Sequence, residues 1–116
     1  MADKWQVEFL NYKAFERVLN RLSSRVKNKV FDRVLKGLVQ LGPDSVASGQ
    51  SRALGGGLYE FRVALPPEVL LRVFFTNVGG RVIVILSAYD KKSNDSKTWQ
   101  NMQIANARRL MKSLER

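Results

Sequence analysis

The chain has 116 residues, contains neither Cys nor His, and carries a net charge of +10. The lack of Cys excludes disulfides and thiolate metal sites, and the lack of His excludes a His general base and ordinary zinc sites. We therefore expect one domain spanning residues 1–116, with no metal and no small-molecule cofactor. The positive charge favours an anionic partner, and nucleic acid suits a charge that is spread over several elements.

No apolar run reaches about 18 residues, so we expect no membrane contact. The N-terminus "MADKWQVEFL" lacks the charged-then-apolar order of a signal peptide. The sequence therefore predicts a cytoplasmic protein.

The first half of the chain predicts a short strand and then two helices. Apolar residues alternate in "WQVEF", which indicates a strand, and from Asn11 the apolar spacing is helical. The first helix should end near Ser23, which can also cap the second, and Gly42 should stop the second. Residues 43–57, rich in Gly and Ser, are predicted to form a loop. Basic residues on the outer faces of both helices are interpreted as mostly solvated surface: Lys13, Arg17, Arg21, Arg25, Lys27, Lys29, Arg33 and Lys36.

The second half predicts three strands and a helix. The strands span about residues 58–65, 70–78 and 81–88, the last two joined by a two-residue glycine turn. A helix follows from about Ser96, with one apolar face formed by Ile104, Ala107, Met111 and Leu114. The expected fold is therefore α+β, with an N-terminal strand and helical hairpin, a four-stranded sheet that is mostly antiparallel, and a C-terminal helix.

Alternation along the first two of these strands sets two arginines on one face of the sheet. If Phe61 and Val73 point to the core, Arg62 and Arg72 point to the opposite face and lie close together. Two arginines that face each other repel unless solvent, an acid or a bound anion separates them. Two interpretations stay open: a surface network of both arginines with Glu60, or a phosphate-binding site.

The third strand adds Tyr89 to the arginine face. The glycine turn puts Phe75 near Val84 and Arg72 near Ser87. The core face then receives Val82, Val84, Leu86 and Ala88, and the arginine face receives Ile83, Ile85, Ser87 and Tyr89. Phe74, Ile83 and Ile85 would share the arginine face, so the C-terminal helix or a partner must cover them. Lys91 and Lys92 follow at the edge, although lysines in a polar loop are usually solvated.

Taken in order, these motifs resemble a known family. From "GGGLYEFRV" through "LLRVFFTNVGGRVIVILSAYDKK" to "IANARRLM", residues 53–110 resemble the RelE/HigB class of type II toxins, in particular its phage-associated HigB-like branch. The resemblance implies a RelE-like α+β fold and a ribosome-dependent endoribonuclease that cuts translated mRNA. It also implies a cognate antitoxin of the helix-turn-helix type as a partner. Two departures are the absence of Pro in "SKTW" and Asp90, which could tune or neutralise a neighbouring lysine.

The resemblance places the catalytic residues at Arg62, Arg72, Tyr89, Lys91 and Lys92. RNA can be cleaved by attack of its own 2′-OH, so the protein needs no nucleophile or metal. The arginines would stabilise the phosphorane, and Lys91 or Tyr89 would be the base, with a pKa lowered by the neighbouring cations. Lys92 is assigned to catalysis or phosphate binding, and Tyr89 alternatively to stacking on a base. Binding of RNA or the ribosome is assigned to Arg52, Arg81 and Lys97.

Two further functions stay open at this point. ParE-like proteins share the implied fold and act on DNA gyrase without cutting RNA. A basic nucleic-acid-binding phage protein could also keep the fold without the chemistry.

Overall fold

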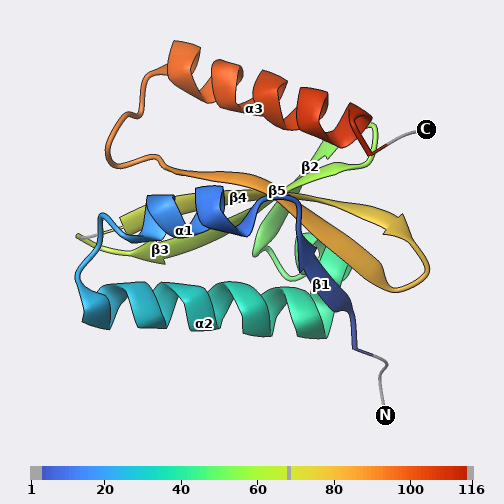
Figure 1. The fold of residues 1–116 in the computed structure, drawn as a ribbon, viewed down its shortest axis with the longest axis horizontal. Helices are drawn as coiled ribbons and strands as arrows, with labels where there is room; N and C mark the ends of the chain where they lie inside the picture. Colours follow the sequence, from blue (N-terminus) through green and yellow to red (C-terminus); the bar gives the residue numbers. More distant parts are fainter. Residues whose placement is uncertain (1–3, 68, 115–116) are drawn as a thin grey trace.

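The computed structural model describes residues 4–67 and 69–114, which form an α+β fold built on one five-stranded sheet. Helices α1 and α2 cover one face of the sheet, and α3 covers the other (Figure 1). In chain order the elements are β1 (Gln6–Phe9), α1 (Tyr12–Leu19), α2 (Ser24–Leu41), the 3₁₀ helix η1 (Gly42–Val46), β2 (Ser51–Gly55), β3 (Leu58–Leu65), β4 (Val69–Gly79), β5 (Val82–Asp90) and α3 (Lys97–Lys112).

The sheet has the strand order β1-β5-β4-β3-β2. Only β1 runs parallel to its neighbour, β5, and the other pairs are antiparallel. The expected α+β class and mostly antiparallel sheet are confirmed, but the expected count of four strands is wrong. The missed strand is β2, in a segment predicted to be a loop. It lacks an apolar alternation because only Ser51 in it is fully buried, so composition could not reveal it.

Local capping signals account for the helix boundaries. The side chain of Ser23 accepts a hydrogen bond from the backbone N–H of Val26 and begins α2, as predicted. Ser96 caps α3 in the same way through the N–H of Trp99. Gly42 ends α2 with a φ of 49°, a conformation that favours glycine. Helix α1 ends at Leu19, a few residues earlier than expected.

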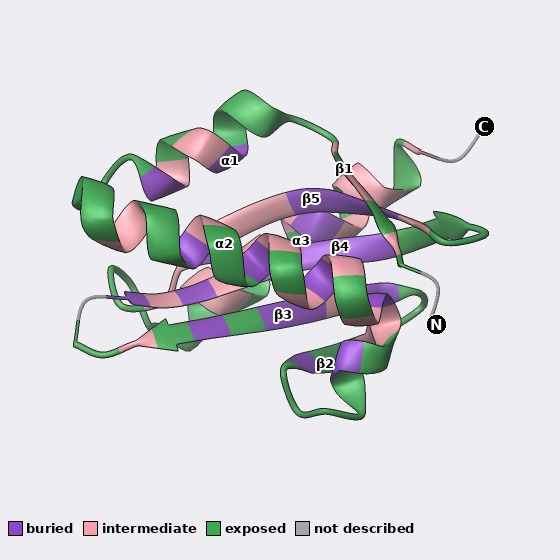
Figure 2. Cartoon of the chain, turned by 90° about the horizontal axis from the view of Figure 1, so that it is seen from below, coloured by how far each residue is buried: buried purple, intermediate pink, exposed green. Residues whose placement is uncertain are grey.

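Buried residues lie along the central strands and on the helices that pack against them (Figure 2). Their side chains form one cluster on each face of the sheet. The cluster under α1 and α2 contains Phe15, Leu19, Val30, Val34, Leu38, Phe61, Val63, Val69, Leu71, Val73, Phe75, Ile83 and Ile85. The cluster under α3 contains Leu58, Phe74, Val84, Leu86, Tyr89 and Ala107. The predicted apolar face of α3 is confirmed, since Ile104, Met111 and Leu114 pack against this second cluster.

The predicted facing of β5 is partly wrong. Ile83 and Ile85 lie in the cluster under α1 and α2, whereas Val84 and Leu86 lie under α3. The cause is an irregular register on β4 and β5, with one shift between Asn77 and Gly79 and a second between Phe74 and Phe75. Because of the first shift, residues 83–86 point to the face opposite to the predicted one. The second shift compensates for the first, so residues from Ser87 onward point to the predicted face.

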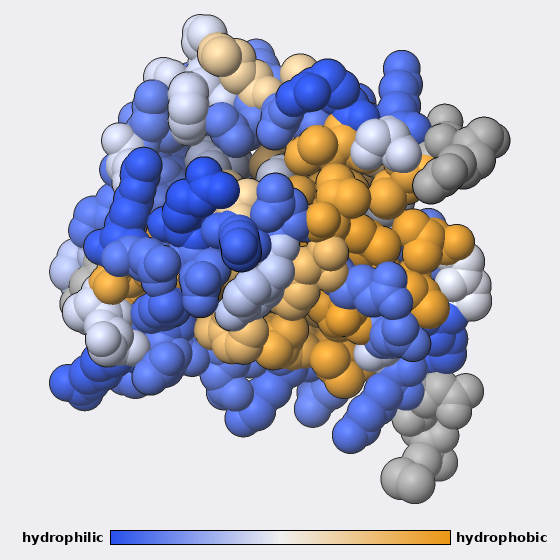
Figure 3. Space-filling view, viewed as in Figure 1, coloured by the Kyte–Doolittle hydropathy of each residue, from blue (hydrophilic) through white to orange (hydrophobic). Residues whose placement is uncertain are grey.

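In the part of the chain that the structure describes, no helix has the length and apolar character needed to cross a bilayer. Figure 3 shows a largely hydrophilic surface with one hydrophobic area, which lies over β5 between α3 and β1.

Candidate anion-binding site

Hydrogen-bonded pairing across three strands brings the predicted basic residues together on the α3 face of the sheet. Arg62 of β3 lies on the same face as Arg72 of β4, as the alternation predicted, and the register sets the two directly opposite each other. Arg72 in turn lies opposite Tyr89 of β5, and Arg52 of β2 lies opposite Glu60. Each position is fixed by the ladder, because a slip of one residue would turn a charged side chain into the core.

The three arginines and Glu60, but not Tyr89, line a small hollow of about 110 Å³ between the sheet and α3. Its lining consists of Arg52, Glu60, Arg62, Arg72, Lys91 and Gln100. We call this the site hollow. Four cationic groups surround it and Glu60 is the single acid in its lining, so the balance of charge favours an anion. A hollow of this size fits a phosphate-sized group and little more.

Glu60 is the residue that holds the arginines together. Its side chain is only 3% exposed, and its Oε1 lies 3.2 Å from a terminal nitrogen of Arg52 and 4.0 Å from Nε of Arg72. A buried carboxylate is costly unless it is paired, and here two guanidiniums share one oxygen. The network anticipated for Arg62 and Arg72 therefore exists with Arg52 in place of Arg62.

Arg62 is exposed, and its hydrogen bonds are to the segment just before β2 rather than to Glu60. Its terminal nitrogen donates to the backbone carbonyl of Gly49 at 3.2 Å, and its own backbone N–H donates to the carbonyl of Gln50. A guanidinium has five N–H donors, so this contact leaves several free to bind a phosphate oxygen. The network with Glu60 therefore leaves Arg62 available for an anion, because Glu60 engages Arg52 and Arg72 rather than Arg62.

Tyr89 lies on the predicted face but is buried. Only 6% of the residue is exposed, and its ring stacks on Phe74 with centroids 5.9 Å apart. Burial, reinforced by the carboxylate of Glu60, raises the pKa of Tyr89 above its ordinary value near 10, against the opposing effect of Arg72 and Arg52. The expectation of a lowered pKa for Tyr89 is therefore wrong: the two arginines act to lower the pKa, but desolvation by burial is the largest effect and outweighs them.

The loop after β5 is anchored by Asp90. Its Oδ1 accepts from the backbone N–H groups of Leu70 and Lys92, and its Oδ2 accepts from the hydroxyl of Ser93. The backbone N–H of Lys91 also donates to the carbonyl of Leu70 at 2.8 Å. Asp90 thus fixes the start of the loop, and no ion pair joins it to Lys91 among the described residues.

The remaining predicted site residues lie outside the site hollow. Lys92 is exposed in the loop and Lys97 is the first residue of α3, also exposed. Arg81 lies at the β4–β5 turn, with its guanidinium 4.4 Å from the ring centre of Trp5. Their roles in binding RNA or in catalysis stay predictions.

Two residues of the site hollow were not assigned to the site from the sequence. Glu60 was recognised only as a possible partner of the arginines, and its burial depends on the pairing of β2, which was not predicted. Gln100 reaches the hollow because α3 packs across the sheet, and no local motif signals this. Within the described residues, no group of three or more acidic side chains is placed to hold a metal ion.

The fold and the site define a small, basic α+β protein with a cationic hollow on one sheet face. Residues 17–112 match the model of the phage-derived Gp49-like protein family (DUF891), and the chain belongs to that family. The family is a toxin-like phage protein family of the RelE/HigB kind, which agrees with the resemblance noted in the motifs. Comparison with curated proteins and with solved structures gave no match.

Proposed function

We propose that this protein is the toxin of a type II toxin–antitoxin system and cleaves translated mRNA on the ribosome without a metal. The observation that carries the proposal is the site hollow, in which four cations converge around space for one phosphate. Membership of a toxin-like phage family supports it independently.

The proposed reaction is attack of the RNA 2′-OH on the adjacent phosphorus, with departure of the 5′-oxygen of the next nucleotide. Charge accumulates on the phosphorane oxygens in the transition state, and fixed guanidiniums are suited to stabilise it. We assign this task to Arg62 and Arg72, which face each other across the ladder. Their mutual repulsion is relieved when a phosphate binds between them.

Removal of the 2′-OH proton is assigned to Lys91, because it lines the site hollow while Tyr89 is buried and favours its neutral form. The proton taken up by the Lys91 amine then passes to the departing 5′-oxygen, which leaves as a hydroxyl. Arg52 and Glu60 act through Arg72: the carboxylate between the two guanidiniums keeps Arg72 aimed at the hollow. Glu60 is therefore a positioning residue. Such preorganisation matters, because small displacements of a charged group reduce its stabilisation of the transition state.

Purified protein in a translating extract tests the proposal. We expect mRNA cuts that require ribosomes and that fall by about 10²- to 10³-fold in Arg72→Ala, the usual cost of removing one group that stabilises an oxyanion. Lys13→Ala is the matched control, since Lys13 is exposed on α1 and lines no hollow described here. Intact mRNA together with inhibited gyrase supercoiling would instead support the ParE-like function. No growth arrest on induced expression would contradict any toxin function.

A cognate antitoxin is part of the proposal. A neighbouring reading frame that encodes a small helix-turn-helix protein, and that restores growth when co-expressed, is the expected finding. Growth that stays arrested with every neighbouring protein co-expressed would contradict this part of the proposal.

A further inference from the structure

Two further hollows continue from the site hollow, and each shares an arginine with the one before. A hollow of about 420 Å³ between α2 and β3 is lined by Arg62, which also lines the site hollow, and by Arg33. A hollow of about 620 Å³ beside the N-terminal part of α2 is lined by Arg33 again, with Arg25 and Lys29. The three hollows therefore form one path, joined at Arg62 and Arg33.

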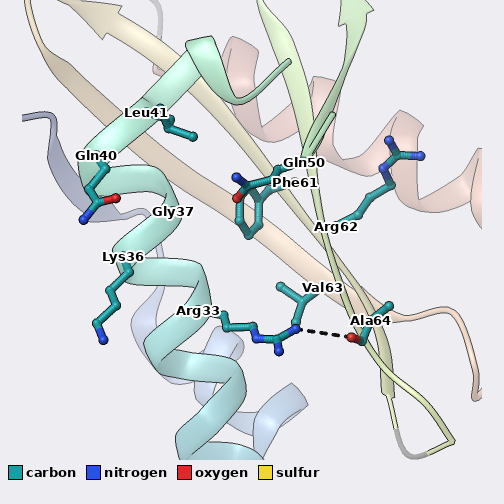
Figure 4. A pocket seen from close by; sticks show the side chains of 10 residues that line it. All are labelled: Arg33, Lys36, Gly37, Gln40, Leu41, Gln50, Phe61, Arg62, Val63 and Ala64. Carbon is teal, nitrogen blue, oxygen red and sulfur yellow. Dashed lines mark hydrogen bonds between the residues drawn. The ribbon is translucent and has the colours of Figure 1, made fainter. Parts of the chain in front are cut away.

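The path crosses the sheet where β3 is not covered by β2. Pairing with β2 reaches only Phe61, so the edge of β3 is open to α2 beyond Arg62. Figure 4 shows Arg62 and Arg33 on opposite sides of β3, with Arg33 reaching from α2 to the strand. Arg33 donates to the carbonyl of Ala64 at 3.4 Å, which holds its guanidinium over this edge. Cations thus line both faces and the edge between them.

The exposed cations of α2 are not explained by helix stability. Arg25 lies in the first turn of α2, where the helix dipole disfavours a positive charge, and that turn carries no acidic residue. We call Arg25, Lys29 and Arg33 the α2 patch. All three are exposed, and no ion pair joins them to a described acidic residue. Glu60 is the single acidic residue among the described linings of the three hollows.

We propose that the α2 patch and the site hollow form one track that binds the phosphate backbone of single-stranded RNA. A flexible chain with evenly spaced negative charges can follow a path that bends over a strand edge, which a rigid duplex cannot do. A protein partner fits less well, because protein interfaces are enriched in Trp, Tyr and Met, and none of these residue types lines the three hollows. The hydrophobic area in Figure 3 lies over β5 and β1 and not along this path. The inference rests on the proposed function for the identity of the polymer.

The test measures binding of a 2′-O-methyl RNA oligonucleotide, which has no 2′-OH and cannot be cleaved. The double variant R25Q/K29Q removes two charges from the α2 patch and keeps good helix formers. The control K13Q/K112Q removes two charges from exposed positions on α1 and α3 that line none of the three hollows. Fluorescence anisotropy over a range of salt concentrations gives both the affinity and its salt slope.

We expect R25Q/K29Q to weaken RNA binding about tenfold and to reduce the salt slope by about 1.4, since each phosphate contact on a single strand contributes about 0.7. The control should change affinity less than about twofold. Equal weakening by both variants, or equal loss of binding to poly-L-glutamate, would overturn the proposal, because either result shows a general effect of charge.

A parallel measurement with vacant ribosomes identifies the source of the RNA. Weaker binding of R25Q/K29Q to the oligonucleotide supports the track, and an additional loss of binding to vacant ribosomes adds ribosomal RNA as a source of the bound strand. Weaker binding to vacant ribosomes alone refutes the track, because the variant then binds single-stranded RNA as well as the wild type does. The nuclease proposal and the track proposal can each be refuted without refuting the other. Ribosome-dependent cutting with equal RNA affinity of both double variants leaves the nuclease standing and refutes the track. Selective loss of RNA binding without any cutting leaves the track standing and refutes the nuclease.

Discussion

Glu60→Gln tests whether the buried carboxylate holds the site together. The substitution keeps the shape of the side chain but removes the charge that Arg52 and Arg72 share at 3.2 and 4.0 Å. At an effective dielectric constant of about 20, one such contact at 3.2 Å is worth about 5 kcal/mol before desolvation is subtracted. Desolvation of the carboxylate offsets much of this, and Arg52 is half exposed, so water can replace its partner. We expect a net loss of about 1–3 kcal/mol in the free energy of unfolding.

Urea denaturation of the wild type, Glu60→Gln and Asp32→Asn measures this loss. Asp32→Asn is the matched control, because it removes the same charge from a fully surface-exposed pair with Lys36 at 3.2 Å. An exposed i,i+4 pair contributes about 0.3–0.5 kcal/mol. If Glu60→Gln costs no more than Asp32→Asn, Glu60 does not hold the arginines and the account of the site is wrong.

Four further substitutions separate the roles of individual residues. Tyr89→Phe should keep mRNA cleavage within about threefold, and a loss of 10²-fold or more would show that its hydroxyl takes part in the chemistry. Because burial raises the pKa of Tyr89, its neutral form stabilises the fold below about pH 10, and this contribution is lost as pH rises through the folded pKa. The wild type should therefore lose stability relative to Tyr89→Phe above about pH 10, and parallel urea curves at alkaline pH would contradict this. Lys92→Ala should reduce cleavage far less than Lys91→Ala, and equal reductions would place Lys92 in the site. Gly42→Ala should destabilise the fold by about 2–4 kcal/mol, because its φ is 49° and a Cβ would lie 2.6 Å from the ring of Trp5; an unchanged thermal midpoint would show that Trp5 does not pack there.

The arginine pair was predictable from the sequence because it depends only on alternation. Phe61, Val63, Leu71 and Val73 must share the core face, and this requirement alone puts Arg62 and Arg72 together on the other face. That they lie directly opposite each other follows from the register in the structure. No knowledge of the turn or of distant contacts is needed. The same pattern identified the face of β3 and β4 that bears the site.

The facing of β5 was not predictable in the same way. Val82 to Leu86 is apolar at every position, so either face of the strand could be buried. The choice depends on the register, and the register shifts near Asn77 and at Phe75 leave no signature in the residues themselves. Tyr89 was nevertheless placed on the correct face, because the two shifts cancel.

The burial of individual side chains and the pairing of charged groups were the properties hardest to predict from the sequence. The sequence analysis predicted Tyr89 as a candidate base, but its ring is buried under α3 and stacked on Phe74. Glu60 depends on Arg52, which lies on a strand that carries no apolar pattern. Tertiary contacts decide where the ends of long side chains lie. The raised pKa of Tyr89 and the pairing of Glu60 with Arg52 could therefore be found only from the structure.

The chemistry of the cut RNA ends tests the central claim most directly. mRNA recovered from a translating extract after addition of the wild-type protein is analysed at each new end. Attack by the 2′-OH predicts a 2′,3′-cyclic phosphate on one fragment and a 5′-hydroxyl on the other, with both ends formed about 10²- to 10³-fold more slowly when Arg72→Ala replaces the wild type. Fragments that carry 5′-phosphates, or cutting by Arg72→Ala at the rate of the wild type, would contradict a metal-independent site built on the two arginines.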